Sequence, residues 1–158
     1  MTDLTNIDLT NTETFNLIIT CADGLEAPLQ TELTSFGIAS EHISTGRLAV
    51  SVTIEQLYHI CLWSRVASRV LLPIKKKNLN TEYDIPDQLY SLGQSVDWTE
   101  QFNVEQSFAI RTSVDKRVPV NQQFAMLRIK DAIVDDFNEK LNTRPDIDSN
   151  NPDISIYV

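Results

Sequence analysis

The sequence contains few cysteines, few glycines and no long apolar run. Two cysteines, Cys21 and Cys61, among 158 residues exclude a disulfide framework and a metal knuckle. We therefore expect a reducing, cytoplasmic compartment. No stretch approaches the roughly 18 consecutive apolar residues that a membrane span needs. Residues 1–14 are polar and acidic and lack the basic and apolar regions of a secretory signal. These absences predict a protein with no membrane partner.

Basic residues are also scarce, and they are unevenly distributed. The chain has 13 Lys and Arg against 22 Asp and Glu, a formal net charge of −9, which argues against a general polyanion binder. Residues 1–46 contain neither Lys nor Arg, and the basic residues gather in 47–77 and 107–130. Any contact with nucleic acid would therefore be local. Chance clustering of solvated surface charge is the alternative.

The combinations of side chains that carry catalysis or bind metals are missing. Cys21 ends a predicted strand and Cys61 lies on the predicted inner face of a helix, so we expect both thiols to be buried and unreactive. The two histidines have no obvious Ser or Cys partner. Asp135 and Asp136 are adjacent and point to different faces of a helix, which does not suit a metal pair. The sequence predicts no catalytic residue and no metal site.

The first half of the chain alternates between strand and helix patterns. Thr53 and Gln56 have the spacing of a capping box, which predicts that a helix begins at Ile54. In order, the pattern predicts a strand over 15–20, a helix over 25–36, one or two strands over 43–52, a helix over 54–68 and a strand over 70–74. This β-α-β-β-α-β order is that of a ferredoxin-like unit.

The second half predicts a strand, a long helix and another strand. After a polar linker over 78–84, it predicts a short helix over 86–92 ended by Gly93, a strand over 107–112, a loop over 114–119, a helix over 121–141 and a strand over 154–158. Phe124 and Leu127 widen the apolar stripe of the long helix, so we expect that helix to be covered on more than one side. A βαβ unit of this kind closes onto a parallel sheet. The alternating strand at the last residues indicates that the sheet is incomplete.

Seven short runs of residues occur in a characteristic order. They are Gly24-Leu25-Glu26, Glu32-Leu33, the run Trp-Ser-Arg-Val-Ala-Ser-Arg at 63–69, the run at 98–102, the run at 130–135, Arg144-Pro145 and Asn151-Pro152-Asp153. In this order they resemble bacterial THUMP-containing RNA methyltransferases, and above all the RlmL family of large-subunit rRNA guanine-N2 methyltransferases. The resemblance covers nearly the whole chain from Phe15 on, and the runs at 63–69 and 130–135 are its most specific parts. The chain departs from it at 120–122, where Val-Asn-Gln stands in place of a frequent Arg-Asn-Ser.

The resemblance implies an α+β fold with two domains. These are a ferredoxin-like domain over 15–77 and a THUMP α/β domain over 78–158 that is incomplete at its C-terminus, after a flexible extension over 1–14. The implied function is the RNA-binding, substrate-positioning region of a 23S rRNA methyltransferase. Its catalytic domain would lie downstream in the same chain and bind S-adenosylmethionine. Four scattered glycines cannot build that cofactor's turn, and we read 151–153 as a turn before a strand, so this region alone should not transfer methyl groups.

Five basic residues in the second half could meet phosphates along one edge. They are Arg111 on a predicted strand, Lys116 and Arg117 in the loop after it, and Arg128 and Lys130 on the long helix. We predict these five as RNA-binding residues. For Arg128 and Lys130 the alternative is a solvated helix face on which either one pairs with a nearby acid.

Arg65 and Arg69 have a structural interpretation instead. A guanidinium group can fork onto carboxylates, and the acidic segment 78–106 follows in the sequence. We expect both arginines, together with Trp98, to lie at the joint between the two domains. Stacking on a base is the alternative for Trp98.

Two other interpretations of function remain open. One is a structural or protein-interaction module whose sheet docks on another protein or on another part of the same chain. The other is the THUMP region of a different RNA-modifying enzyme, such as a tRNA thiolation enzyme. The sequence downstream would separate them, because a glycine-rich turn with an Asn-Pro-Pro-aromatic loop indicates a methyltransferase and a PP-loop-like motif indicates thiolation.

Overall fold

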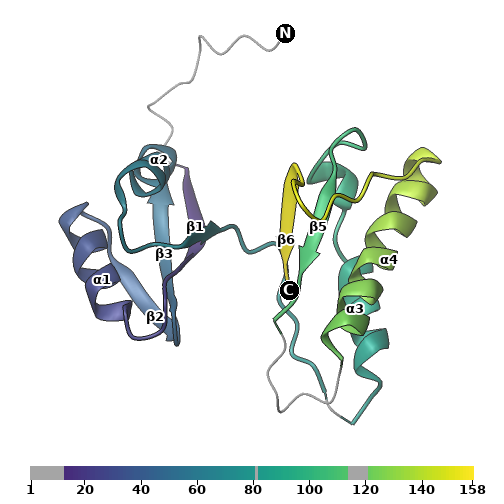
Figure 1. The fold of residues 1–158 in the computed structure, drawn as a ribbon, viewed down its shortest axis with the longest axis horizontal. Helices are drawn as coiled ribbons and strands as arrows, with labels where there is room; N and C mark the ends of the chain where they lie inside the picture. Colours follow the sequence, from purple (N-terminus) through teal and green to yellow (C-terminus); the bar gives the residue numbers. More distant parts are fainter. Residues whose placement is uncertain (1–12, 81, 114–120) are drawn as a thin grey trace, which may run out of the picture. The chain divides into compact units, whose positions relative to one another are not determined.

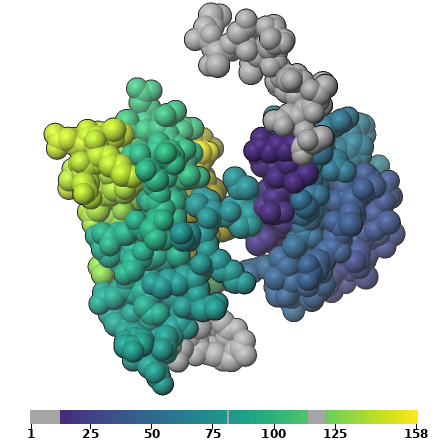
Figure 2. Space-filling model, turned by 180° about the vertical axis from the view of Figure 1, so that it is seen from behind, coloured from purple at the N-terminus to yellow at the C-terminus, as the bar shows by residue number. Residues whose placement is uncertain are grey.

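Figure 1 shows the computed structural model, which describes residues 13–80, 82–113 and 121–158. The chain divides into two compact units, one ending at Ile74 and the other beginning at Lys75. In Figure 2 the first unit is coloured purple to blue and the second runs on to green and yellow. Most of the expected flexible extension over 1–14 lies outside the described residues. The mixture of helices and strands in both units confirms the predicted α+β class.

The first unit has the predicted β-α-β-β-α-β order. Its elements are β1 (Thr14–Thr20), α1 (Glu26–Ser35), β2 (Ser40–Ser44), β3 (Arg47–Thr53), α2 (Ile54–Trp63) and β4 (Arg69–Leu71). The strands form one sheet in the order β2-β3-β1-β4, and every pair in it is antiparallel. The two central strands are thus the first and third, which is the ferredoxin-like arrangement.

One face of this sheet carries the core of the first unit. Leu17 and Ile19 of β1 are buried and belong to one apolar cluster with Leu33 of α1 and Ile60 of α2. Because successive side chains of a strand point to opposite faces, the residues between them lie on the other face of the sheet. The apolar alternation of β1 and β3 therefore decides which side the helices cover.

Helix α2 begins where the sequence predicts and ends earlier. Thr53 and Gln56 form the full capping box, in which the Thr53 hydroxyl accepts from the Gln56 N–H and the Gln56 side chain accepts from the Thr53 N–H. The prediction that the helix continues to Ser68 is wrong, because it ends at Trp63 and Ser64 is extended, with φ −67° and ψ 134°. The following strand spans Arg69–Leu71, which is shorter than the predicted 70–74.

Cys61 is exposed, contrary to the prediction of a buried thiol, whereas Cys21 is buried as predicted. The fully buried position of α2 is Ile60, and the next residue is turned by about 100° around the helix axis. That rotation carries the Cys61 side chain out of the core. The error arose because the buried stripe of this short helix is narrower than its apolar content indicates.

The second unit contains two packed helices and a small parallel sheet. Its elements are α3 (Ile85–Gln94), a 3-10 helix η1 (Trp98–Glu100), β5 (Phe108–Arg111), α4 (Gln122–Leu141) and β6 (Ile154–Tyr157). Strands β5 and β6 are parallel, which confirms the predicted βαβ unit. On its other side β5 meets an isolated parallel bridge between Phe108 and Ile147.

Gly93 lies inside α3 and does not end it, which corrects the predicted helix over 86–92. It is buried against α4, and a Cβ atom added there would lie 2.6 Å from the Cβ of Ala132. The two helix backbones thus approach each other closely at these small residues. Gly93 serves helix packing rather than helix termination.

Helix α4 packs against α3, η1 and β5, so more than one side of it is covered as predicted. Ala125, Ile129 and Ile133 are among its buried residues. Phe124 and Leu127, which were expected to extend the covered stripe, are exposed instead. The close contact with α3 is made through small side chains, so the apolar residues at these two positions remain at the surface.

Candidate nucleic-acid interface

The carboxyl ends of β5 and β6 meet at one edge of the second unit. Arg111, the last residue of β5, pairs in register with Tyr157, the last residue of β6. The ladder continues one step further, because Val158 N–H donates to the Arg111 carbonyl at 3.0 Å and Ser113 N–H donates to the Val158 carbonyl at 2.8 Å. Arg111 is exposed, and its Nη2 donates to the Ser149 carbonyl at 3.3 Å. Arg111 is therefore the predicted RNA-binding residue that the structure places most openly at the surface.

The segment that links β5 to α4 is closed at its base. The Thr112 hydroxyl donates to the Gln122 carbonyl at 3.2 Å, and the Gln122 side-chain amide donates back to the Thr112 carbonyl. Lys116 and Arg117 belong to this segment but lie outside the described residues. The two cations must nevertheless leave and re-enter the fold beside Arg111, because both ends of their segment are joined there.

Asn121 and Gln122 have roles that sequence reasoning missed. The Asn121 Oδ1 accepts from the N–H groups of Gln123 and Phe124 and so caps the start of α4. Asn before an apolar helical stripe is a general N-cap signal and could have identified this role. The Gln122 contact could not have been found, because it depends on a residue ten positions away.

Arg128 is held between α3 and α4. Its Nη2 lies 2.9 Å from an Asp87 carboxylate oxygen, and its guanidinium carbon lies 4.7 Å from the centre of the Tyr90 ring. The Tyr90 hydroxyl in turn donates to Asp135 at 2.6 Å, and that hydrogen bond raises the pKa of Tyr90. The alternative of pairing with a nearby acid is thus the one that the structure supplies for Arg128.

Lys130 also has an acidic partner, although a weaker one. Its Nζ lies 3.1 Å from the neighbouring Asp131, and the Lys130 side chain is 33% exposed. Exposed ion pairs of this kind contribute only about 0–1 kcal/mol. Lys130 can therefore exchange Asp131 for a phosphate at little cost, which Arg128 cannot do.

Arg65 lies in a turn that Glu32 of α1 organises. The Glu32 carboxylate accepts from the Ser64 hydroxyl at 2.5 Å, from the Arg65 N–H at 2.8 Å and from the Val66 N–H at 3.4 Å. Burial acts to raise the pKa of Glu32, but these hydrogen bonds outweigh it and hold the pKa below its ordinary value. The acid that anchors this turn comes from the first unit and not from the segment 78–106. Glu32 was quoted above as part of a recognisable run, but its role was missed.

Arg69 lies in a row of residues across the sheet of the first unit. The register pairs Thr20 of β1 with Arg47 of β3 on one side and with Arg69 of β4 on the other. Directly opposed residues share a face, so both arginines lie on the face that the helices leave uncovered. Sequence reasoning did not select Arg47. The prediction that Arg65 and Arg69 lie at the joint between the domains stays a prediction.

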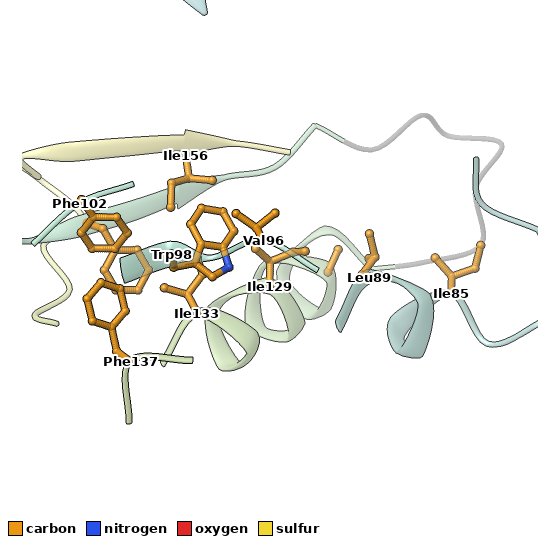
Figure 3. Close-up of a cluster of buried hydrophobic side chains, with 11 residues drawn as sticks. Ile85, Leu89, Val96, Trp98, Phe102, Ile129, Ile133, Phe137 and Ile156 are labelled. Atoms are coloured by element: carbon orange, nitrogen blue, oxygen red, sulfur yellow. The ribbon is translucent and has the colours of Figure 1, made fainter. Parts of the chain in front are cut away.

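Trp98 is buried within the core of the second unit. Figure 3 shows its ring near Ile133 and Phe102, in the cluster that α4 covers. Its indole N–H donates to the Gly93 carbonyl at 2.8 Å, and its backbone N–H donates to Asp136 at 2.9 Å. These contacts satisfy both polar groups, and a ring buried in this way is not available to stack on a base.

Two kinds of site were searched for over residues 13–80, 82–113 and 121–158. In these ranges no three His, Cys, Asp or Glu side chains lie close enough to hold a metal ion. In the same part of the chain no helix is both long and apolar enough to cross a membrane.

Comparison with known families now separates the candidates. The family described as "RlmL ferredoxin-like domain" matches residues 16–71, and the THUMP domain family matches residues 84–158. A protein named "Ribosomal RNA large subunit methyltransferase K/L" from Psychrobacter arcticus is 73% identical over 143 residues, which is 90% of this chain and 19% of the relative. This chain belongs to the RlmL family. It therefore spans about a fifth of the length of the curated relatives it matches.

Solved structures share the fold of this RlmL-family chain at low identity. TrmN from Thermus thermophilus matches 92% of the chain and 42% of its own, with 20% identity and a TM-score of 0.67. A 4-thiouridine synthetase solved with RNA and ATP matches 91% of the chain and 38% of its own, with 12% identity and a TM-score of 0.52. The fold is thus shared by proteins with different chemistry, and the family assignment rests on the sequence matches.

Proposed function

We propose that this chain is the RNA-binding and substrate-positioning region of a large-subunit rRNA methyltransferase. The name of its 73% identical relative and the THUMP match over 84–158 support this. On this proposal the methyl transfer occurs in a catalytic domain elsewhere in the same polypeptide, with S-adenosylmethionine as the methyl donor. The target would be 23S rRNA in the bacterial cytoplasm. We also keep domain boundaries of 15–77 and 78–158, which the division between Ile74 and Lys75 supports.

The observation that carries the proposal is the gathering of cations at the carboxyl end of β5. Arg111 is exposed there, and the segment that holds Lys116 and Arg117 is joined at its base by Thr112 and Gln122. In α/β folds the carboxyl ends of parallel strands are where ligands bind. Three cations in this position can contact successive phosphates of an RNA strand.

The structure also ranks the cations on helix α4. Arg128 is committed to Asp87 and Tyr90, so we assign it to helix packing and not to RNA. Lys130 keeps a place as a secondary phosphate contact, because its pair with Asp131 is exposed. On this assignment, removing Arg128 destabilises the second unit and removing Lys130 weakens RNA binding slightly.

Charge reversal at Arg111 tests this proposal. The full chain should bind an rRNA fragment with an affinity that falls as salt rises, with a slope of about −0.7 per phosphate for single-stranded RNA. Arg111→Glu should make that slope shallower by about 0.7 or more, because at least one phosphate contact is lost. A fluorescence anisotropy titration at several salt concentrations measures both quantities.

Arg144→Glu is the matched control for this experiment. Arg144 is exposed and lies just beyond the C-terminus of α4, whereas Arg111 lies beside its N-terminus. Helix α4 has 20 residues and so separates its two ends by about 30 Å. Equal effects of the two reversals would show that overall charge and not a local interface attracts the RNA, and the proposed site would be rejected.

A second candidate function, a protein-docking module, is favoured by one feature of the first unit. Leu62 and Trp63 at the end of α2 are 75% and 65% exposed, which is unusual for large apolar side chains so close together. Docking of another part of the polypeptide over them would shield the neighbouring Cys61. Alkylation of Cys61 in the full polypeptide, followed by mass spectrometry with buried Cys21 as the internal reference, tests this. A Cys61 as slow to react as Cys21 supports docking, and a fast one refutes it.

A further inference from the structure

Tyr157 and Arg111 are neighbours on one face of the β5–β6 sheet. The parallel register pairs them directly, and adjacent strands lie about 4.8 Å apart. The side chains of directly opposed residues leave the sheet on the same side. An aromatic ring and a guanidinium group therefore stand next to each other where both strands end.

The face that carries them is the one turned away from the core of the second unit. Phe108 and Ile156, at alternate positions of the two strands, are buried in the cluster formed with α3 and α4. Because side chains alternate along a strand, Tyr157 and Arg111 project to the opposite side. Tyr157 is 41% exposed, and Ser155 before it on the same face is short and exposed. The tyrosine ring is thus accessible at the surface.

The surroundings of this pair are basic and aromatic. The Thr112–Gln122 contacts bring the start of α4 beside the end of β5, and Phe124 in the first turn of α4 is 49% exposed. The segment with the two further cations leaves from the same end. Single-stranded RNA is recognised in this way, with bases stacked on aromatic rings and guanidinium planes and with cations along the backbone.

We propose that Tyr157 and Arg111 form a stacking site for an unpaired nucleobase of the RNA. This rests on the proposed RNA-binding function and adds to it the strandedness of the substrate. The base lies on the Tyr157 ring, with the Arg111 guanidinium beside it, oriented by its hydrogen bond to the Ser149 carbonyl at 3.3 Å. A duplex would not satisfy such a site, because its bases are already stacked.

The experiment compares Tyr157→Leu, Tyr157→Phe and the wild-type full chain. The probes are two labelled single-stranded RNAs of equal length, one with bases throughout and one with abasic sugars at its centre. Tyr157→Leu should weaken binding of the first RNA by roughly 5-fold to 150-fold, the range for the loss of one stacked base, and should leave the second nearly unchanged. Tyr157→Phe keeps the ring and should bind both RNAs like the wild type. The salt slope should be the same in all three proteins, because no charge is removed.

The outcomes separate this inference from the function on which it rests. If wild type binds RNA with the expected salt dependence and Tyr157→Leu is indistinguishable from it, the stacking site is rejected and RNA binding stands. If wild type binds neither RNA, both are rejected. Photocrosslinking of wild type to RNA containing 5-iodouridine guards against an unfolded variant. A crosslink at Tyr157 supports the site, and crosslinks confined to other peptides overturn it.

Discussion

Replacing Glu32 with Gln tests what ends helix α2 and shapes the turn that follows it. The Glu32 carboxylate accepts three hydrogen bonds, one from the Ser64 hydroxyl and two from the N–H groups of Arg65 and Val66. Gln has nearly the same shape but replaces one acceptor oxygen with an NH2 group. Whichever way the amide turns, that NH2 group faces a donor. Glu32→Gln thus removes the charge and leaves at least one N–H or O–H group without its partner.

The size of the effect follows from these three contacts. Hydrogen bonds to a charged group contribute about 1.5–3 kcal/mol each, against about 0.5–1.5 kcal/mol for neutral ones. Glu32 is partly exposed, so we expect a total loss of about 2 kcal/mol in the free energy of unfolding of the first unit. For a domain of 60–100 residues, this lowers the melting temperature by roughly 8–16 °C.

The effect should depend on pH in a defined direction. The hydrogen bonds hold the pKa of Glu32 below its ordinary value of 4.5 against the opposing effect of burial. A carboxyl group with a lowered pKa in the folded state stabilises the protein fully above the unfolded value and loses that contribution as the pH falls through the folded value. The difference between wild type and Glu32→Gln should be constant near neutral pH and should shrink below pH 4.5.

Calorimetry of the full chain at several pH values measures this difference. Hydrogen exchange of the peptide over 63–68 gives a local readout, because the Arg65 and Val66 amides lose their acceptor. Glu41→Gln, at an exposed position of β2, is the matched control and should change the unfolding free energy by no more than about 0.5 kcal/mol. Arg65→Ala keeps the backbone N–H and should cost less than Glu32→Gln. An unchanged melting temperature in Glu32→Gln, with unchanged exchange over 63–68, would refute the role assigned to this carboxylate.

Two further predictions concern the packing of the second unit. Gly93→Ala places a methyl group about 2.6 Å from the Ala132 side chain, so calorimetry should show a loss of roughly 1–3 kcal/mol, and Ala132→Gly in the same protein should restore part of it. A Gly93→Ala protein as stable as wild type would contradict the close helix approach. Arg128→Met should lower the melting temperature but leave the salt slope of RNA binding unchanged, because its guanidinium group serves Asp87 and Tyr90. A shallower slope in anisotropy titrations would return Arg128 to the RNA interface.

The parts of the fold that were predicted correctly depend on neighbours in sequence. The capping box of Thr53 and Gln56 involves residues three apart, and it located the start of α2. The end of α2 was missed because the competing acceptor, Glu32, lies 32 residues before Ser64. Gly93 was misread as a stop for the same reason, since its purpose is visible only once Ala132 lies opposite it.

The candidate site divides along the same line. The sequence identified Arg111, Lys116 and Arg117 as basic residues around one strand and one loop, because a strand and the loop after it are contiguous. It could not separate Arg128 from Lys130, since both lie on one helix and only the position of α3 supplies Asp87 to the first. It did not select Tyr157 at all, because a tyrosine near the end of a strand carries no local signal until the register sets it beside Arg111.

The sequence by itself determined the family, the order of the elements and the location of the basic residues, because these depend on residue identity and short-range periodicity. The tertiary structure alone decided which of those basic residues are available. Partners such as Asp87, Glu32 and Ser149 come from distant parts of the chain, and a charge is free or committed according to what folding places within hydrogen-bond distance of it. Two cations with the same local sequence signal thus receive different roles from the packing around them.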